Sequence, residues 1–258
     1  MGNSVNCCLC GSSRHREIFS DELDGQPAKL DYNFTPETRK MHRTVKCEHC
    51  GLIFANPMPT LVYKDVVDPS YMATIDQRHT TAKQAIRAIL KRKPKGSLVD
   101  IGCATGAFLD VASENYAVEG VELSNWAADI ACQTHTVYRE PFEDLGFIDR
   151  FDVATMWDVI EHLPDPLRTM DAVAKSLKHG GIVVVYTGDA NAILPRLLGR
   201  KWWWWQGMHI HSFPRQTLKA LFEKVGLQVI ERKSMTKHFR SKSLAKSLRR
   251  YRLEPFSR

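Results

Sequence analysis

The chain has 258 residues, of which 43% are hydrophobic, enough to bury the core of one large domain with a small appendage. No apolar run reaches the roughly 20 residues that span a bilayer, and the N-terminus lacks a signal-peptide pattern, so we expect a cytoplasmic protein without a transmembrane segment. The formal net charge of +7 suits an anionic partner, but the excess lies in the C-terminal tail and says little about the rest of the chain.

Two Cys-x-x-Cys-Gly motifs lie near the start of the sequence, at residues 7–11 and 47–51. Their spacing is typical of a closed, structural zinc site with four thiolate ligands, here Cys7, Cys10, Cys47 and Cys50. The alternatives are two disulfides, which a reducing cytosol disfavours, or unrelated free thiols. Cys8 is a spare thiol beside a ligand, and His49 is expected to be a spacer. The polar loop between the motifs cannot form a core, so the metal would supply the folding energy of a zinc-ribbon-like module over residues 1–60.

A connecting segment over residues 61–94 carries Tyr63 and Tyr71 and a helix expected from residue 77 to residue 90. Apolar strands then alternate with helices, and the expected strands cover 97–101, 117–121, 136–138, 151–157, 182–186 and 227–231. This alternation predicts an α/β domain over residues 95–235 with a doubly wound, Rossmann-like, mostly parallel sheet. The tail 236–258 is basic with helix-like spacing, which suits a solvated face or peripheral contact with an anionic membrane.

The first strand of this domain ends in a glycine-rich turn with the sequence Asp100-Ile101-Gly102-Cys103-Ala104-Thr105-Gly106. Such a turn brings backbone N–H groups close to a ligand, although dinucleotide-binding folds carry a similar one. Asp100 precedes the first glycine, where it can reach an ammonium group, and Glu122 closes the next strand, where it can take both ribose hydroxyls. A cationic ligand with an amino acid head and a ribose fits this pair of acids, and S-adenosylmethionine is such a ligand.

The fourth strand and its loop, residues 151–166, end in the sequence Asp158-Val159-Ile160-Glu161-His162-Leu163-Pro164-Asp165-Pro166. This stretch resembles the same region of class I S-adenosylmethionine-dependent methyltransferases, and its Glu-His-Leu-Pro-Asp-Pro ending resembles the branch that includes ubiquinone O-methyltransferases and many glycan and natural-product enzymes. The resemblance covers residues 95–232. The sequence departs from it at Ala104, where many members have glycine, and no seventh, antiparallel strand is found after residue 231. The cysteine motifs resemble the zinc module of some sugar and natural-product methyltransferases.

The resemblance implies further positions in the cofactor site. Leu123 and Phe142 would enclose the adenine, Glu143 or Asp144 would lie near its amino group, and Asp158 would lie at the carboxyl edge of the sheet. The connecting segment would fold over the cofactor as a lid; the alternative is that Tyr63 and Tyr71 are aromatic residues that only pack. The expected cofactor-binding residues are therefore Asp100, Gly102, Cys103, Ala104, Gly106, Glu122, Leu123, Phe142, Glu143 and Asp158.

A hydroxyl acceptor needs a base, and histidine suits this role because its pKa is about 6.5. The candidates are His162, His209 and His211. His162 lies in the family motif, and the other two follow the four tryptophans at 202–205, in the insertion after the fifth strand where relatives place substrate contacts. Four consecutive tryptophans cannot all face one core, so some of them should be exposed or line a cleft.

Together these features predict S-adenosylmethionine-dependent methyl transfer to a small-molecule, sugar or glycan acceptor, at oxygen or at carbon. Oxygen is favoured, because sugar C-methyltransferases with similar zinc modules carry another C-terminal domain that this sequence does not show. The alternative is an rRNA methyltransferase that binds RNA through the zinc module, which requires a continuous basic face leading to the cofactor cleft. A non-enzymatic zinc-ribbon binding protein is opposed by the intact Asp100, Gly102, Gly106 and Glu122.

Overall fold

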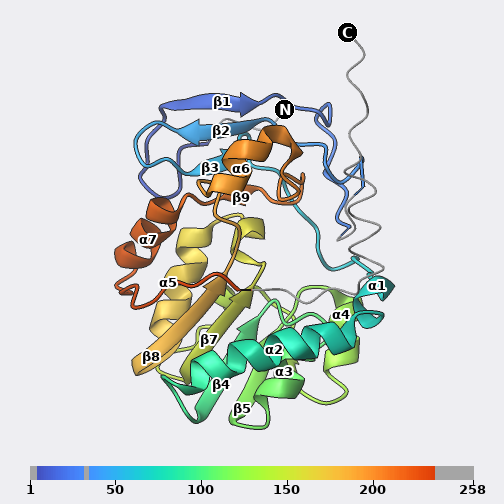
Figure 1. Cartoon of the computed structure of the whole chain (residues 1–258), viewed down its shortest axis with the longest axis vertical. Helices are drawn as coiled ribbons and strands as arrows, with labels where there is room; N and C mark the ends of the chain where they lie inside the picture. The colour runs from blue at the N-terminus through green and yellow to red at the C-terminus, as the bar shows by residue number, and fades with distance from the viewer. Residues whose placement is uncertain (1–4, 32–34, 236–258) are drawn as a thin grey trace.

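The computed structural model describes residues 5–31 and 35–235, which form two sheets at opposite ends of the long axis of the molecule (Figure 1). The larger sheet has the order β6-β5-β4-β7-β8, and all of its strand pairs are parallel. Its strands are β4 (Gly96–Ile101), β5 (Tyr116–Val121), β6 (Thr136–Tyr138), β7 (Phe151–Trp157) and β8 (Leu177–Tyr186). The predicted Rossmann-like sheet is therefore confirmed.

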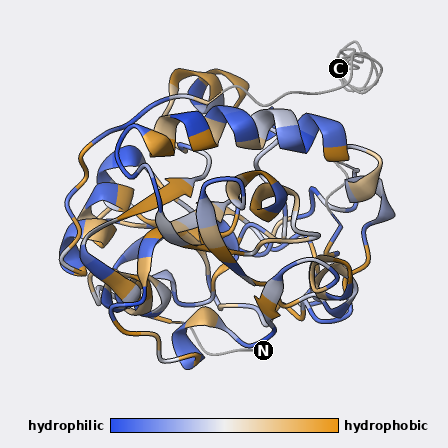
Figure 2. Cartoon of the chain, turned by 90° about the horizontal axis from the view of Figure 1, so that it is seen from below, coloured by the Kyte–Doolittle hydropathy of each residue, from blue (hydrophilic) through white to orange (hydrophobic). Residues whose placement is uncertain are grey.

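Helices cover both faces of the parallel sheet, because the side chains of each strand alternate between two cores. Leu98 of β4 packs in one core with α2 (Ile75–Leu90) and α3 (Ala107–Ala112). The next residue, Val99, packs in the other core with α5 (Pro166–Ser176) and α7 (Arg215–Lys224). In Figure 2 the longest helix, α2, carries polar and apolar residues along its length, as expected for a helix with one face on a sheet.

Local signals in the sequence set the ends of several helices. Ser124 accepts a hydrogen bond from the backbone N–H of Ala127 and caps α4 (Asn125–Ala131). Asp165 caps α5 in the same way, and Pro166 occupies the first position of that helix. The shorter helices are α1 (Pro69–Met72), α6 (Ile193–Leu198) and the 3-10 turns η1 (Phe142–Asp144), η2 (Ile160–His162) and η3 (Gly199–Lys201). None of the helices in the described ranges is long and apolar enough to cross a membrane.

The second sheet is antiparallel, with the order β1-β2-β3-β9. Its first three strands come from the N-terminal module: β1 (His15–Phe19), β2 (Thr44–Cys47) and β3 (Ile53–Ala55). The fourth strand, β9 (His211–Ser212), comes from the insertion after β8 and pairs with β3. The sheet that carries the cysteine motifs is thus completed by a strand from the second half of the chain.

The structure contradicts the strand predicted over residues 227–231: this stretch has no regular structure and pairs with no strand of the described residues. Leu227 and Val229 are half-buried while Gln228 and Ile230 are exposed. Alternate residues of this stretch therefore pack against the domain, although the backbone forms no β-sheet hydrogen bonds with a neighbouring strand. The chain after β8 is directed instead to the antiparallel sheet through β9. The fifth strand also begins earlier than predicted, because α5 ends at Ser176 and β8 runs through the Gly180-Gly181 pair. The predictions for the tail 236–258 fall outside the described residues.

Candidate functional site

The glycine-rich turn between β4 and α3 has three residues in the left-handed region of backbone space: Gly102 (φ 73°), Ala104 (φ 49°) and Gly106 (φ 87°). A side chain at Gly102 would also collide with Val159, because an added Cβ would lie 2.5 Å from Cγ2 of that residue. Glycine removes both costs at this position. Ala104 adopts the same conformation with a methyl group, which explains why the departure from the family pattern leaves the turn intact.

Two acids flank this turn, of which Asp100 is buried and Glu122 is half-buried. Asp100, at the end of β4, is 1% exposed, and its carboxylate accepts a 2.6 Å hydrogen bond from the Thr155 hydroxyl of β7. Burial, together with the charge of Glu122, raises the pKa of Asp100 to about 8. Glu122 follows β5 and accepts backbone N–H bonds from Ala104 at 2.9 Å and Ser124 at 2.7 Å. Burial raises the pKa of its carboxyl as well. Both acids would be stabilised in the ionised form by a cationic ligand.

The connecting segment contacts the chain next to Glu122. Its backbone is held to the start of α4, where the Ser124 hydroxyl donates to the carbonyl of Val66 at 2.7 Å. Burial, together with the charges of Asp100 and Glu122, raises the pKa of the Tyr71 phenol to about 12, although the Arg78 guanidinium lowers it. The guanidinium of Arg78 lies 3.3 Å from the centre of the Tyr71 ring. Sequence reasoning singled out Tyr71 but missed Arg78, whose only signal is its place in the helix directly after Tyr71.

Two polar groups at the same edge of the sheet are buried without a hydrogen-bond partner among the described residues: the Thr105 hydroxyl and the Trp157 indole N–H. Buried polar groups in native proteins are almost always satisfied, so a ligand at this edge would remove an energetic cost. The Trp157 ring packs on Phe108 with centroids 5.0 Å apart. Asp158 follows it with φ 55°, and its backbone N–H bonds the carbonyl of Tyr186 at 3.0 Å. The acids, the strained turn and these donors together fit S-adenosylmethionine.

The residues expected around the adenine make contacts within the protein that fix their positions. Phe142 is 3% exposed and packs edge to face on Phe147, with centroids 5.8 Å apart. Glu143 accepts a 3.0 Å hydrogen bond from the Thr169 hydroxyl. Leu123 is half-buried next to Glu122. These contacts are all with other protein side chains, so binding of the adenine by Leu123, Phe142 and Glu143 stays a prediction.

The structure brings two of the three candidate histidines together. The rings of His162 and His209 lie edge to face with centroids 4.8 Å apart, and both are 8% exposed. His162 Nδ1 is 2.9 Å from the carbonyl oxygen of Met208, and His209 Nδ1 is 2.7 Å from that of Trp204. Burial lowers the pKa of His162. Glu161 lies beside them, fully buried, with ligand atoms of all three residues within 4.8 Å of one another.

His211 is not part of this pair. It is 1% exposed on β9, where its ring stacks between Phe54 and Phe213 at centroid distances of 6.3 and 6.0 Å. Its Nε2 lies 3.8 Å from Sγ of Cys8, the spare thiol. Burial lowers the pKa of His211 to about 4. The His211 ring therefore packs between the N-terminal sheet and the insertion. The remaining candidates for a base are His162 and His209.

Some of the four consecutive tryptophans are buried and another is exposed. Trp202 and Trp205 are buried in a small core with Met41 of the N-terminal module, whereas Trp203 is 40% exposed. The Trp204 ring lies over Gly188, where an added Cβ would come within 2.6 Å of it, and beside His209, with centroids 4.8 Å apart. Gly188 follows β8, so Trp204 borders the carboxyl edge of the parallel sheet.

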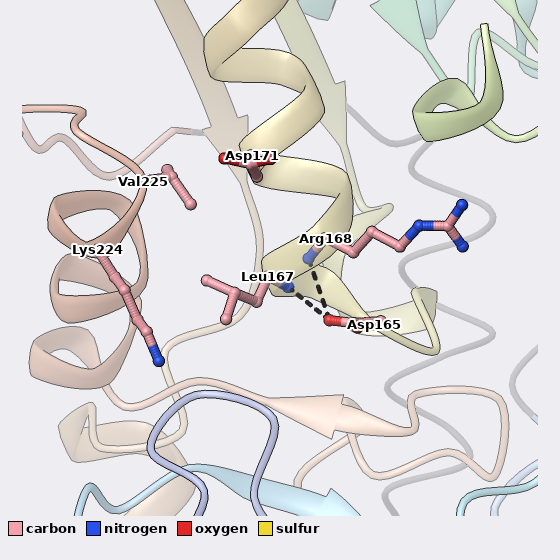
Figure 3. A pocket seen from close by; sticks show the side chains of 6 residues that line it. All are labelled: Asp165, Leu167, Arg168, Asp171, Lys224 and Val225. Atoms are coloured by element: carbon pink, nitrogen blue, oxygen red, sulfur yellow. Dashed lines mark hydrogen bonds between the residues drawn. The ribbon is translucent and has the colours of Figure 1, made fainter. Parts of the chain in front are cut away.

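A surface pocket of about 330 Å³ lies between α5 and α7 (Figure 3). It is lined by Asp165, Leu167, Arg168, Asp171, Lys224 and Val225. The figure shows the carboxylate of Asp165 turned to the N–H groups of Leu167 and Arg168, each at 3.1 Å, so it serves as the cap of α5. None of the predicted cofactor or catalytic residues lines this pocket.

The four predicted zinc ligands lie together in the N-terminal module. The sulfur atoms of Cys7, Cys10, Cys47 and Cys50 are all within 4.8 Å of one another. Two of the distances, Cys7 to Cys50 and Cys10 to Cys47, are 3.5 Å. Tetrahedral zinc with Zn–S bonds of about 2.3 Å requires sulfur atoms about 3.8 Å apart, so the donor set fits the metal. Cys8 and His49 are not in the cluster, as expected.

Comparison with known proteins agrees with this geometry. Residues 75–232 match the family described as a methyltransferase domain. Ubiquinone biosynthesis O-methyltransferases are similar in sequence: that of Cereibacter sphaeroides ATCC 17025 is 30% identical over 154 residues, 54% of this chain and 62% of the relative. That of Alkalilimnicola ehrlichii is 31% identical over 104 residues, 36% of this chain and 42% of the relative. This chain therefore spans less than two thirds of the relatives' length.

Solved structures share the fold. A chain of the complex between the Haloferax volcanii Trm112 methyltransferase activator and its methyltransferase is 21% identical, with a TM-score of 0.54 over 66% of this chain and 77% of that chain. A SAM-dependent methyltransferase from Archaeoglobus fulgidus is 14% identical, with a TM-score of 0.52 over 70% and 90% of the two chains. The chain thus belongs to the class I S-adenosylmethionine-dependent methyltransferases, and S-adenosylmethionine is its cofactor.

Proposed function

We propose that this enzyme methylates a hydroxyl oxygen of a small-molecule or glycan acceptor. The observation that carries the proposal is the buried pair of His162 and His209, which follows β7 and β8 at the carboxyl edge of the parallel sheet. In open α/β sheets ligands bind outside this edge, where the cofactor turn also lies. The similarity to ubiquinone biosynthesis O-methyltransferases supports oxygen as the methylated atom.

The cofactor supplies an electrophilic methyl group on a sulfonium. In the proposed site Asp100 binds the ammonium group, while backbone N–H groups of the turn from Gly102 to Gly106, including those of Cys103 and Ala104, contact the amino acid part. Glu122 binds the ribose hydroxyls. Leu123 and Phe142 enclose the adenine in this proposal, Glu143 lies near its amino group, and Asp158 lies at the carboxyl edge of the sheet. Tyr71 and the Arg78 guanidinium cover the site from the lid, and a guanidinium there suits the cofactor carboxylate.

The two histidines are set up to accept a proton. A carbonyl oxygen only accepts hydrogen bonds, so the bonds to Met208 and Trp204 require a proton on Nδ1 of each ring. Each Nε2 then carries a lone pair while the ring is neutral. Because burial lowers the pKa of His162, the neutral form dominates near pH 7. Either Nε2 can take the proton of an acceptor hydroxyl that is aligned with the methyl group.

The walls around the histidines suit a ring-shaped, hydroxylated acceptor. Trp204 offers an aromatic face beside His209 and an indole N–H that is buried without a partner in the described part of the chain. An aromatic face stacks on the C–H face of a sugar or on a phenol, and the indole N–H can donate to a second hydroxyl. Tyr63 packs edge-on against His162 from the lid, with centroids 5.9 Å apart.

We also propose that Cys7, Cys10, Cys47 and Cys50 hold a structural zinc ion within residues 1–60, joined by the lid segment 61–94 to the catalytic domain 95–235. A closed set of four thiolates leaves no open position for chemistry. The burial of Cys7 and Cys47 in a core shared with Val99 of the catalytic domain supports a structural role.

The test compares histidine variants on a panel of phenols, catechols and sugars, with S-adenosylhomocysteine formation as the readout. We expect His209→Ala to lower kcat by about 10²–10⁴-fold with cofactor affinity nearly unchanged. His179→Ala changes an exposed histidine and is the matched control. Full activity of both His162→Ala and His209→Ala would contradict the proposal, as would product methylated only on nitrogen or on RNA.

A further inference from the structure

Glu161, His162 and His209 form a buried cluster of metal-ligating groups separate from the four cysteines. One ligand atom from each residue lies within 4.8 Å of the other two. Glu161 is 0% exposed, and each histidine is 8% exposed. A buried carboxylate is costly unless a positive charge or several hydrogen bonds compensate it. The positive charge of a metal ion at the centre of this cluster would offset the cost of burying the Glu161 carboxylate.

The orientation of both rings is fixed in the manner of metal ligands. A histidine that binds a metal through one nitrogen commonly donates its other N–H to a backbone carbonyl, which sets the tautomer. His162 and His209 both do so through Nδ1, with acceptor distances of 2.9 and 2.7 Å. With Nδ1 as the donor, Nε2 is the nitrogen of each ring that carries a lone pair, and a metal ion would bind there. The carboxylate is oriented too, because the Thr187 hydroxyl donates to Glu161 Oε2 at 3.0 Å.

We propose that Glu161, His162 and His209 bind a divalent transition-metal ion at the acceptor side of the cleft. Two imidazoles and one carboxylate suit Zn²⁺, Mn²⁺, Fe²⁺ or Co²⁺, and three protein ligands leave positions open for water or substrate oxygen. Such a site differs in kind from the closed thiolate site of the N-terminal module. The alternative is that the cluster holds no metal ion and that one of the histidines is protonated and pairs with the Glu161 carboxylate.

The chemical role of this ion rests on the proposed function, although its binding does not. Held by Glu161, His162 and His209, an ion with an open position would act as a Lewis acid and would lower the pKa of an acceptor hydroxyl bound to it. His162 and His209 would then hold the ion, and this role would replace the role as base that the proposed function gives them; the hydroxyl proton would pass to water. Activity would depend on the metal even though the methyl group comes from the cofactor.

The experiment is a titration of the purified full chain with Mn²⁺, followed by electron paramagnetic resonance of the free ion. Manganese prefers oxygen and nitrogen ligands and does not compete for four thiolates, so the cysteine site stays out of the measurement. We expect one Mn²⁺ per chain, and affinity at least tenfold lower in Glu161→Gln and His209→Ala. Cofactor binding by calorimetry confirms that each variant is folded.

A matched control exists on the surface, where His79 and His135 both contact the carboxylate of Asp110 at 3.0 and 2.7 Å. Asp110→Asn removes the carboxylate of an exposed set with the same residue types, and we expect it to leave Mn²⁺ affinity unchanged. Absence of stoichiometric binding, or equal affinity in Glu161→Gln and the parent, would overturn the proposal. Hydroxyl methylation that survives chelation in a chain without Mn²⁺ binding would overturn the ion and leave the function standing. Mn²⁺ binding without hydroxyl methylation would overturn the proposed function and leave the metal site standing.

Discussion

Phe54 of β3 and His211 of β9 face each other across an antiparallel strand pair, with ring centroids 6.3 Å apart. Phe54 belongs to the module that carries the cysteines, and His211 belongs to the insertion after the fifth strand of the catalytic sheet. Phe54 also shares a core with Val99 of β4 and Leu221 of α7. The module and the catalytic domain are therefore joined by a strand pair and by a continuous core.

This junction predicts the effect of losing the metal. In Cys47→Ser one thiolate is lost from the zinc set, so we expect the zinc that survives dialysis to fall from about one per chain to near zero. Hydrogen exchange should then rise over β1 to β3 and also over β9, because β9 pairs only with β3 among the described strands. The strands β4 and β5 should stay protected. Cys132→Ser alters an exposed cysteine and should change neither measurement.

Glu122 should contribute strongly to cofactor binding. We expect Glu122→Ala to weaken S-adenosylmethionine binding by about 1.5–3 kcal/mol, because a charged acceptor of hydrogen bonds is lost and the N–H groups of Ala104 and Ser124 lose their partner. Glu122→Gln keeps one acceptor oxygen and should recover part of the affinity. Calorimetry measures both, with the exposed Glu114→Gln as the control. Unchanged affinity in Glu122→Ala would remove this residue from the site.

The raised pKa of Asp100 predicts a pH dependence of cofactor binding. The carboxyl is mostly protonated below its pKa of about 8, and an ammonium ligand prefers the carboxylate. Affinity for S-adenosylmethionine should therefore rise with pH from about 6 toward 8, and binding near pH 7 should release a proton. Calorimetry in two buffers of different ionisation enthalpy detects that proton. Asp100→Asn should bind more weakly and release none; proton release of equal size in the variant would refute the assignment.

Gly102 should not tolerate a side chain. In Gly102→Ala the new Cβ would lie 2.5 Å from Cγ2 of Val159, and the residue would keep a φ of 73°, which costs about 1–2 kcal/mol by itself. We expect urea denaturation to show lower stability and calorimetry to show weaker cofactor binding. In the background of Val159→Ala the collision is removed but the backbone cost remains, so the second substitution should restore only part of the stability. Full restoration would show that backbone strain is unimportant here.

The sequence by itself determined the elements that depend on short-range patterns. The strands over 136–138 and 151–157 form at the predicted residues, because a run of apolar residues between turn signals is a local property. The caps at Ser124 and Asp165 and the glycine-rich turn were equally local. The spacing of the cysteines was enough to predict one cluster, since two Cys-x-x-Cys turns have few other uses.

Only the tertiary structure decided which distant residues meet. Nothing in the sequence distinguishes His209 from His211, yet a difference of two residues sends one ring to His162 and the other between Phe54 and Phe213. The cause is the pairing of β9 with β3, a contact between segments far apart in the chain that no local pattern encodes. The predicted sixth strand likewise has no partner in either sheet of the described residues, although its apolar pattern is local. Long-range pairing thus selected the histidine at the candidate site.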